Sequence, residues 1–294
     1  MNHGAADVTG HGADWLTASR REVPALLWRD SAESTNSELV RLAADPGLPA
    51  FTTLVTTDQT AGRGRLDRSW IAPAGTALAV SVLVRAPAVA AASLGWLPLA
   101  AGAAMFDAVA GVLPPGVRVG IKWPNDVLLD GRKVCGILSE LVPADAASSG
   151  IAVVIGAGVN LTMSAEQLPV ATATSLTLAG ADADAADDAG DAAATDAAAA
   201  DAGLTDRVLA AYLHSLIALV TALFQSGGDA VASGLHAAVV ERCSTIGRDV
   251  RVELPGGAHL LGRAVGIDGI GRLQVRDDAD QLRAVAAGDI VHLR

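Results

Sequence analysis

Short runs of apolar residues, several of them alternating with small or polar residues, predict a series of β-strands through the first half of the chain. The Asp130-Gly131 pair, which stands between two such runs, is typical of a tight hairpin. Strands joined by hairpins pair antiparallel, so a mainly antiparallel sheet is expected rather than a repeated strand–helix–strand unit. The predicted strands include Thr52–Thr57, Leu78–Val84, Val117–Ile121, Val127–Leu129, Val134–Leu141 and Ile151–Ile155.

Helices are predicted at three places. Thr35 and Glu38 have the T-x-x-E spacing of a capping box, and apolar residues on one helical face follow them. Residues 93–112 and 208–224 are apolar enough for two helices packed against the sheet.

Two stretches have the length of a membrane span, Ala86–Phe106 and Val208–Phe224. The first is mostly alanine with two prolines and two glycines, which gives little insertion energy, and the second is interrupted by polar residues. We therefore expect helices buried in a globular protein and no membrane partner. The N-terminus has no basic start followed by an apolar run, so no signal peptide is expected and a cytoplasmic location is predicted.

The last part of the chain has shorter predicted strands than the part before it. Over residues 246–294, short strand patterns are separated by turn signals at Gly256-Gly257, Asp268-Gly269 and Gly288-Asp289, which predicts a small β domain. Residues 15–245 form the predicted main domain. Residues 1–14 show no periodicity, and the Ala/Asp tract at 180–203 contains no lysine or arginine, so both are expected to be disordered.

Composition and charge exclude several functions. The chain has 294 residues, and 51% of them are hydrophobic, which is enough for a sizeable core. Its net charge of −11 argues against general nucleic-acid binding, because proteins with that function present a basic face to phosphates. Cys135 and Cys243 lie far apart and the six histidines are scattered, so neither a disulfide scaffold nor a zinc site is expected.

A segment rich in glycine and arginine, Thr56–Trp70, carries the first candidate chemistry. Gly62 and Gly64 let the backbone approach a ligand closely, while Arg63, Arg65 and Arg68 place three positive charges within six residues. This combination suits a phosphate or a carboxylate. The spacing is neither that of a P-loop nor that of a dinucleotide-binding turn, and taken alone the segment is equally compatible with a solvated surface loop.

A second group of charged residues follows the third predicted strand. Lys122 and Lys133 are expected on neighbouring strands, with Asp126 in the turn close to them. A surface salt bridge is the ordinary interpretation of any one such pair, but a lysine on an otherwise apolar strand indicates a bound anion. At the predicted helix N-terminus, Ser34 and its two neighbours can cap the helix or hydrogen-bond a small polar ligand.

Five motifs, taken in their order, resemble those of the biotin protein ligases. The resemblance covers about Trp28 to Leu178 and, more weakly, Leu204 to Arg294. The motifs are Ser34-Thr35-Asn36, Gln59 with Gly62-Arg63-Gly64-Arg65, Lys122-Trp123-Pro124-Asn125-Asp126, Gly131-Arg132-Lys133 with Gly136-Ile137-Leu138, and Gly156-Ala157-Gly158-Val159-Asn160-Leu161.

The resemblance implies an α+β fold: a mixed, mainly antiparallel sheet flanked by helices, like that of class II synthetases, followed by an SH3-like β-barrel. It also implies ATP-dependent activation of biotin to biotinyl-5′-AMP with release of pyrophosphate, and then transfer to a lysine of a biotin carboxyl carrier protein or domain of an acyl-CoA carboxylase. Mg²⁺ is expected with ATP and not in a protein cage, with Asp126 nearest to it.

The resemblance assigns roles residue by residue. Lys133, Arg63, Arg65 and Asp126 are the expected catalytic residues, with Asp126 assisting deprotonation of the attacking amine. The expected biotin-binding residues are Ser34, Thr35, Asn36, Gln59, Arg63, Gly64, Arg65, Lys133 and Gly136, and those for ATP or the adenylate are Arg65, Trp70, Lys122, Asn125, Asn160 and Arg294.

The sequence departs from the family at its N-terminus. Members that act as repressors carry a helix-turn-helix domain there, and only about 27 residues precede the region of resemblance here. A monofunctional enzyme without DNA binding is therefore expected, as a monomer or a ligand-dependent homodimer. Two alternatives stay open: a lipoate–protein ligase of the same fold, whose expected acyl-site signature differs from QTAGRGR, and a non-enzymatic biotin-binding regulator, which would not need Lys133 and Trp70 together.

Overall fold

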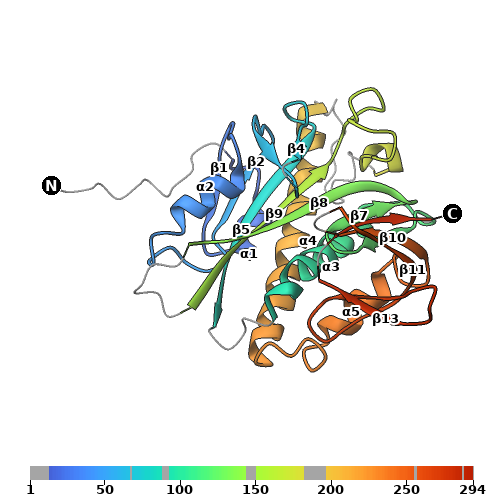
Figure 1. The fold of residues 1–294 in the computed structure, drawn as a ribbon. Coiled ribbons are helices and arrows are strands. Elements are labelled where there is room, and N and C mark those ends of the chain that lie inside the picture. Colours follow the sequence, from blue (N-terminus) through green and yellow to red (C-terminus); the bar gives the residue numbers. More distant parts are fainter. Residues whose placement is uncertain are drawn as a thin grey trace.

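The computed structural model describes residues 13–66, 68–87, 93–143, 150–181, 197–254, 257–286 and 288–293. Seven strands form the larger sheet: β1 (Leu26–Trp28), β2 (Thr53–Thr56), β5 (Ala77–Pro87), β6 (Val119–Lys122), β7 (Asp126–Leu129), β8 (Arg132–Leu141) and β9 (Gly150–Asn160). Their order is β1-β2-β5-β9-β8-β7-β6 (Figure 1). Strands β1 and β2 pair in parallel, and the other neighbours in this sheet pair antiparallel, which confirms the predicted sheet.

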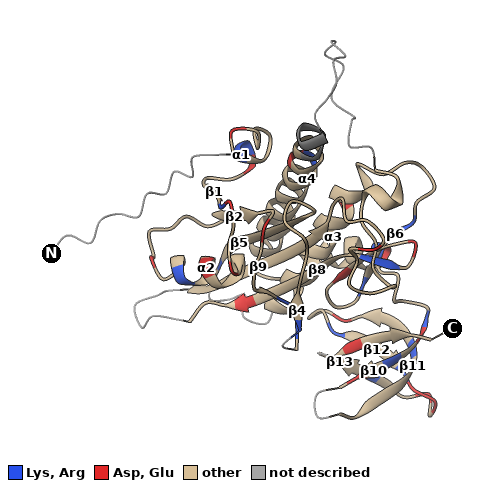
Figure 2. Ribbon diagram, turned by 90° about the horizontal axis from the view of Figure 1, so that it is seen from above, with Lys and Arg blue, Asp and Glu red and all other residues tan. Residues whose placement is uncertain are grey.

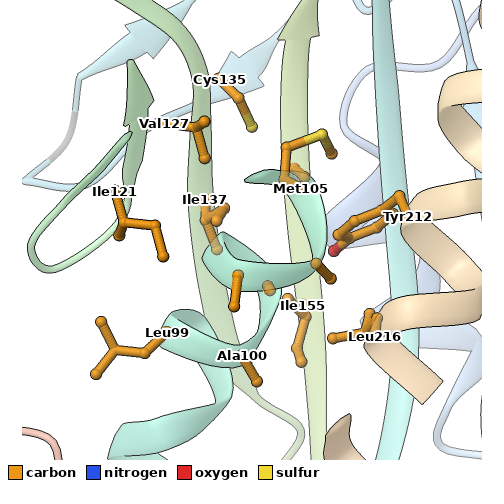
Figure 3. Close-up of a cluster of buried hydrophobic side chains, with 14 of the residues drawn as sticks. Leu99, Ala100, Met105, Ile121, Val127, Cys135, Ile137, Ile155, Tyr212 and Leu216 are labelled. Carbon is orange, nitrogen blue, oxygen red and sulfur yellow. The ribbon is translucent and has the colours of Figure 1, made fainter. Parts of the chain in front are cut away.

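Helices cover both faces of this sheet. On one face lie α3 (Leu97–Ala110) and α4 (Ala197–Gln225), with α5 (Leu235–Arg242) packed beside α3. Figure 3 shows side chains of the sheet pointing toward α3, with α4 alongside. The short helices α1 (Ser19–Glu22) and α2 (Thr35–Leu42) complete the set, and α2 packs on the opposite face.

The central strand β5 is buried on both faces. The alternate positions Leu78, Val80, Val82 and Val84 belong to the core under α3 and α4. The positions between them are also buried: Leu83 packs under α2, while Ala79 and Ser81 lie further along the same face. Because helix α2 covers only part of that face, the rest is left for a ligand.

The N-terminus of α2 differs by one residue from the predicted capping box. Ser34 is the N-cap, with an extended backbone, and its Oγ accepts a hydrogen bond from Ser37 N at 3.4 Å. Thr35 is already helical. Glu38 does not reach back to the cap; it pairs with Arg29 at 2.8 Å.

The C-terminal residues form a second, five-stranded antiparallel sheet, as expected. Its strands are β10 (Asp249–Glu253), β11 (His259–Ile267), β12 (Leu273–Arg276), β13 (Leu282–Val285) and β14 (Asp289–His292), in the order β13-β12-β11-β10-β14. Two tryptophans of the main domain donate ring N–H bonds to this sheet's β11–β12 turn: Trp96 to Gly269 O and Trp123 to Gly271 O, both at 3.0 Å. The turn is therefore fixed against the main domain.

Both segments expected to be disordered are partly ordered. Residues 1–12 and 182–196 lie outside the described residues, but Ala13 is fully buried and Ala181 is 7% exposed. Helix α4 begins at Ala197, inside the Ala/Asp tract. From Ala197 onward the prediction was wrong because alanine is a strong helix former and the apolar face of α4 packs on the core directly afterwards. Ala13 and Ala181 lie outside helices and are ordered by burial in the core.

Two helices are long and apolar enough, by length and composition, to cross a membrane: Ser93–Ala110 and Ala202–Gln225. Both correspond to predicted core helices. In the structure α3 and α4 pack against each other and on the main sheet, with their apolar side chains in one hydrophobic cluster. This packing is typical of the interior helices of a globular domain.

A Tyr212→Phe substitution is expected to leave the free energy of unfolding unchanged or to raise it by about 1–2 kcal/mol. The ring of Tyr212 extends from α4 into the core (Figure 3), and its hydroxyl is buried with no hydrogen-bond partner in the part of the chain that the structure describes. Urea unfolding of both proteins measures the difference, and Tyr212→Ala, which leaves a cavity, should destabilise by about 3–5 kcal/mol. A loss of more than 1 kcal/mol in the phenylalanine variant would mean that the hydroxyl has a partner after all.

Candidate functional site

A cavity lies on the face of the main sheet that α2 leaves partly uncovered. Its floor is a row of residues with very small side chains or none. Across β5, β9 and β8, Ala79 pairs with Gly158 and Gly158 pairs with Gly136. The next row consists of Ser81, Gly156 and Leu138. Because nothing larger than a methyl group projects from the first row, the uncovered face of the sheet is hollow there.

The three glycines make room for particular side chains. A Cβ on Gly158 would meet the Trp70 indole at 2.6 Å, and a Cβ on Gly136 would meet Lys133 Nζ at 2.9 Å. A Cβ on Gly156 would overlap the side-chain amide of Asn36. Glycine at Gly156 and Gly158 is therefore explained by close approach and not by backbone conformation, whereas at Gly136 the flexible end of Lys133 could move.

The structure brings together all nine residues that the sequence predicted for biotin, and three of the six predicted for ATP, of which Arg65 belongs to both sets. Further lining residues come from the floor and from β8: Ala79, Ile137, Leu138, Gly156, Ala157 and Gly158. The predicted residues that line the cavity are Ser34, Thr35, Asn36, Gln59, Arg63, Gly64, Arg65, Trp70, Asn125, Lys133 and Gly136.

One end of the cavity is polar and uncharged. Thr35 donates to Gln59 Oε1 from its backbone N at 2.9 Å and from its Oγ1 at 3.1 Å. Ser81 Oγ lies 2.6 Å from Asn36 Oδ1 and 2.8 Å from Thr35 Oγ1. Asn36 Nδ2 donates to Leu138 O at 3.0 Å. These contacts fix the side chains before any ligand arrives.

Ser81 belongs to this end although the sequence interpretation missed it. It lies fully buried between Val80 and Val82 on the central strand. A lone hydroxyl inside a continuous apolar strand was the available signal, since a buried hydroxyl needs a partner.

The other end of the cavity carries charge. Lys133 Nζ lies 2.6 Å from Asp126 Oδ1. This carboxylate oxygen is buried and has no well-directed hydrogen bond among the described residues, so the nearby ammonium charge is what compensates it. Lys122 pairs with Asp126 in the sheet register. The prediction that the two lysines lie on neighbouring strands was wrong: β7 runs between β6 and β8, because the hairpin at Asp130-Gly131 inserts it there.

A second cavity adjoins the charged end and reaches the C-terminal sheet. It shares several residues with the first cavity, and Lys122 and Asp126 join them there. Glu253 and Asp289 of the C-terminal sheet line its far side. Basic and acidic side chains therefore both face this space.

The glycine- and arginine-rich segment forms a short hairpin over the cavity. Its strands are β3 (Gly62–Arg63) and β4 (Ser69–Trp70). Residues 61–66 and 68–70 are called the arginine loop below. Arg65 Nη1 donates to Asn125 Oδ1 at 2.8 Å, and Asn125 Nδ2 donates to Ile137 O at 2.9 Å, so the loop is bonded to the main sheet through one amide.

One predicted residue that the structure describes, Asn160, is not brought to either cavity. Asn160 is 7% exposed, lines neither cavity, and donates its Nδ2 to Thr174 O at 2.9 Å, so it holds a neighbouring turn. Arg294 lies outside the described residues. The strand predicted for Ile151–Ile155 continues in the structure through the glycine motif to Asn160, whose side chain points into the protein.

Two titratable groups near the site are held neutral. Burial raises the pKa of the Cys135 thiol to about 12, so it does not act as a nucleophile at neutral pH. Burial, together with the charges of Lys122 and Arg248, lowers the pKa of His292 to about 4. Among the residues that the structure describes, no group of three or more His, Cys, Asp or Glu side chains could hold a metal ion.

Comparison with solved structures identifies the fold. A biotin protein ligase from Aquifex aeolicus, solved with biotin and ATP, superimposes with a TM-score of 0.63 at 22% identity over 92% of this chain and 98% of that chain. The ligand-free form of the same protein gives 0.63 at 19% identity. At this identity the match establishes the fold, including the C-terminal β domain.

Sequence comparison then establishes the family. Residues 31–160 match the Biotin/lipoate A/B protein ligase family, and residues 245–293 match the Biotin protein ligase C terminal domain. The chain is 37% identical over 262 residues to the biotin–[acetyl-CoA-carboxylase] ligase of Mycobacterium tuberculosis, covering 89% of this chain and 86% of that protein. It is 44% identical over 131 residues to the Paracoccus denitrificans protein of the same name, covering 44% and 51%. The chain belongs to the biotin protein ligase family.

Proposed function

We propose that this chain is an ATP-dependent biotin protein ligase that forms biotinyl-5′-AMP and transfers biotin to a lysine of a carrier domain of an acyl-CoA carboxylase. The observation that carries the proposal is a cavity with an uncharged polar end and a cationic end, on the fold of this family. Biotin has the same division: a neutral ureido ring and a carboxylate tail. The name of the Mycobacterium tuberculosis relative supports the choice of substrate and carrier.

The polar end suits the ring. Ser34, Thr35, Asn36 and Gln59 supply hydroxyl and amide groups that match a ureido group's donors and acceptors. The small residues of the floor leave space for the thioether ring. Arg63, Gly64 and Arg65 then lie over the tail, with Lys133 at the carboxylate.

The cationic end performs the first reaction. A biotin carboxylate oxygen attacks the α-phosphorus of ATP, the new C–O–P bond forms, the bond to the bridging oxygen breaks, and pyrophosphate leaves. Two anions approach only where cations compensate them in fixed positions. Lys133 is held by Asp126 and Arg65 by Asn125, so both positive charges are in place beforehand.

The adjoining cavity suits the nucleotide. Trp70 offers an indole face for adenine, and Lys122 and Asn125 line the same space as Lys133. Asn160 would contribute indirectly, through the turn that its side chain holds. A role for Arg294 in binding ATP rests on the sequence resemblance alone. Mg²⁺ would be held by the phosphates, with Asp126 the nearest protein carboxylate, and would supply charge compensation there.

The second reaction needs no nucleophile from this chain. The carrier's lysine attacks the mixed anhydride, and AMP leaves. Asp126 is the carboxylate available to take the proton of that amine, whose usual pKa is about 10.4. We propose a cytoplasmic enzyme that acts as a monomer or a ligand-dependent dimer, without DNA or membrane as partners.

Pyrophosphate release from ATP tests the function directly. Biotin should support release and lipoate should not, and a carrier domain should accelerate turnover. Release with lipoate alone would favour the lipoate–protein ligase alternative. Biotin binding without release under any condition would favour a non-enzymatic regulator.

An Arg65→Gly variant is expected to form the adenylate but to release it faster, by about tenfold or more, because the guanidinium that joins the loop to Asn125 is lost. Free biotinyl-5′-AMP, measured by its reaction with added lysine, reports the release rate. Arg41→Gly, an exposed change on α2 outside the cavity, is the control for loss of an arginine. Equal retention of the adenylate by variant and parent would reduce Arg65 to a role in charge compensation.

A further inference from the structure

A carboxylate on the main sheet, Glu140, contacts the arginine loop, and none of the sequence motifs includes this residue. Glu140 lies on β8, where it pairs with Val154 of β9. Its Oε2 accepts from Arg63 Nη2 at 2.6 Å and from Asn36 Nδ2 at 2.9 Å. One oxygen therefore joins the polar end of the cavity to the loop that covers it.

A second carboxylate holds the loop from the C-terminal sheet. Asp289, at the start of β14, has Oδ2 paired with Arg68 Nη2 and Oδ1 at 3.8 Å from Arg65 Nη1. Arg65 Nη2 also donates to Gly288 O at 3.3 Å. Asp289 is 18% exposed and Arg65 22%, so their contact is screened by solvent less than an ordinary surface pair is, whereas Arg68 is 64% exposed. Figure 2 shows β4 at the side of the main sheet that faces the C-terminal strands.

Both carboxylates stand on rigid supports. Glu140 lies in a paired strand, and the C-terminal sheet is bonded to the main domain through Trp96 and Trp123. A Cβ on Gly288 would meet Glu253 O at 2.8 Å, so this glycine lets the chain turn closely into β14 and present Asp289. Flexible side chains on the loop therefore meet acids whose backbones are fixed.

We propose that Glu140 and Asp289 are positioning residues that hold the arginine loop over the cavity before a ligand binds. Three arginines within six residues repel one another, and an isolated glycine-rich segment would spread. Residues 61–70 carry three arginines and one aspartate, a formal charge of +2, and the carboxylates of Glu140 and Asp289 compensate that charge, which favours the closed loop. An incoming anion then meets arginines that are already in place.

The consequence for catalysis rests on the proposed function. If the loop retains biotinyl-5′-AMP, then Asp289→Asn should release the adenylate about tenfold faster. The C-terminal sheet would thereby take part in retention of the intermediate through one carboxylate.

The test of the loop contacts needs neither biotin nor ATP. Trypsin cleaves after arginine, so limited digestion of the full ligand-free chain reports opening at Arg63, Arg65 and Arg68 directly. Glu140→Gln should raise cleavage after Arg63, and Asp289→Asn should raise cleavage after Arg65 and Arg68, each by about tenfold relative to cleavage after the exposed Arg118. Asp277→Asn, which removes a carboxylate paired with Arg283 away from the loop, is the matched control.

Salt supplies a second measurement that does not depend on a variant's folding. Ion pairs weaken with ionic strength, so loop cleavage in the parent should rise with salt more than cleavage after Arg118, whose pair with Asp130 is far more exposed, and the rise should shrink in Asp289→Asn. Unchanged loop cleavage in both acid variants, or an equal rise at Arg118, would overturn the proposal. Because no substrate is present, that result is distinct from a failure of biotin ligation, which would appear as absent pyrophosphate release in the parent.

Discussion

A Lys133→Ala variant is expected to keep the fold and to lose about a thousandfold or more in the rate of pyrophosphate release from ATP and biotin. The Lys133 ammonium lines the cationic end of the cavity and lies 2.6 Å from Asp126. Its charge is needed most when the biotin carboxylate and the α-phosphate come together, so its removal raises the barrier more than it weakens binding. Single-turnover release at saturating substrates measures the effect.

The control is Arg132→Ala, which removes the exposed neighbouring cation in the same hairpin and should change the rate by less than about twofold. Thermal unfolding of both variants should show that the domain persists, because Lys133 is 43% exposed and water can reach the carboxylate left behind. Near-normal release by a folded Lys133→Ala protein would move the catalytic role to another cation.

A Gly156→Ala variant is expected to lose about a hundredfold in affinity for biotin. The added methyl would overlap the Asn36 amide, which is held on three sides by Ser81, Leu138 and Glu140. Displacing Asn36 would remove the hydrogen bonds proposed between its amide and the biotin ring and disturb the neighbouring groups, and two or three bonds to the ligand at about 1 kcal/mol each correspond to roughly a hundredfold in a dissociation constant. Calorimetric titration with biotin alone measures it.

Gly102→Ala is the matched control, because a Cβ there would meet Ile121 at 3.5 Å and Ile137 at 3.7 Å, which are ordinary contacts. It should leave biotin affinity unchanged and, as a helix interior position, should cost no stability. Retained affinity in a folded Gly156→Ala protein would show that the Asn36 end of the cavity is not where biotin binds.

The sequence motifs predicted most of the cavity because its residues lie in short, locally ordered segments. Ser34 to Asn36 begin a helix, and the hairpin at Asp130-Gly131 sets where Lys133 stands. The errors came from longer range. A helix-capping pattern fits both Thr35 and Ser34, and only the extended backbone of Ser34 decides between them. Asn160 ends a motif that resembles the family's, but its side-chain amide donates a hydrogen bond to Thr174 O inside the protein.

By itself, the sequence determined the strands, the main helices, the charged loop and the family resemblance, because these depend on periodicity and on contiguous motifs. Tertiary structure alone decided which partners the charges have. Arg68 meets Asp289 across 221 positions, and Arg63 meets Glu140 across 77. Such pairs arise where the chain is folded back by sheet register and domain packing, and no local spacing records them. The same is true of the glycine floor, whose three residues on two strands become one surface only when β8 and β9 pair.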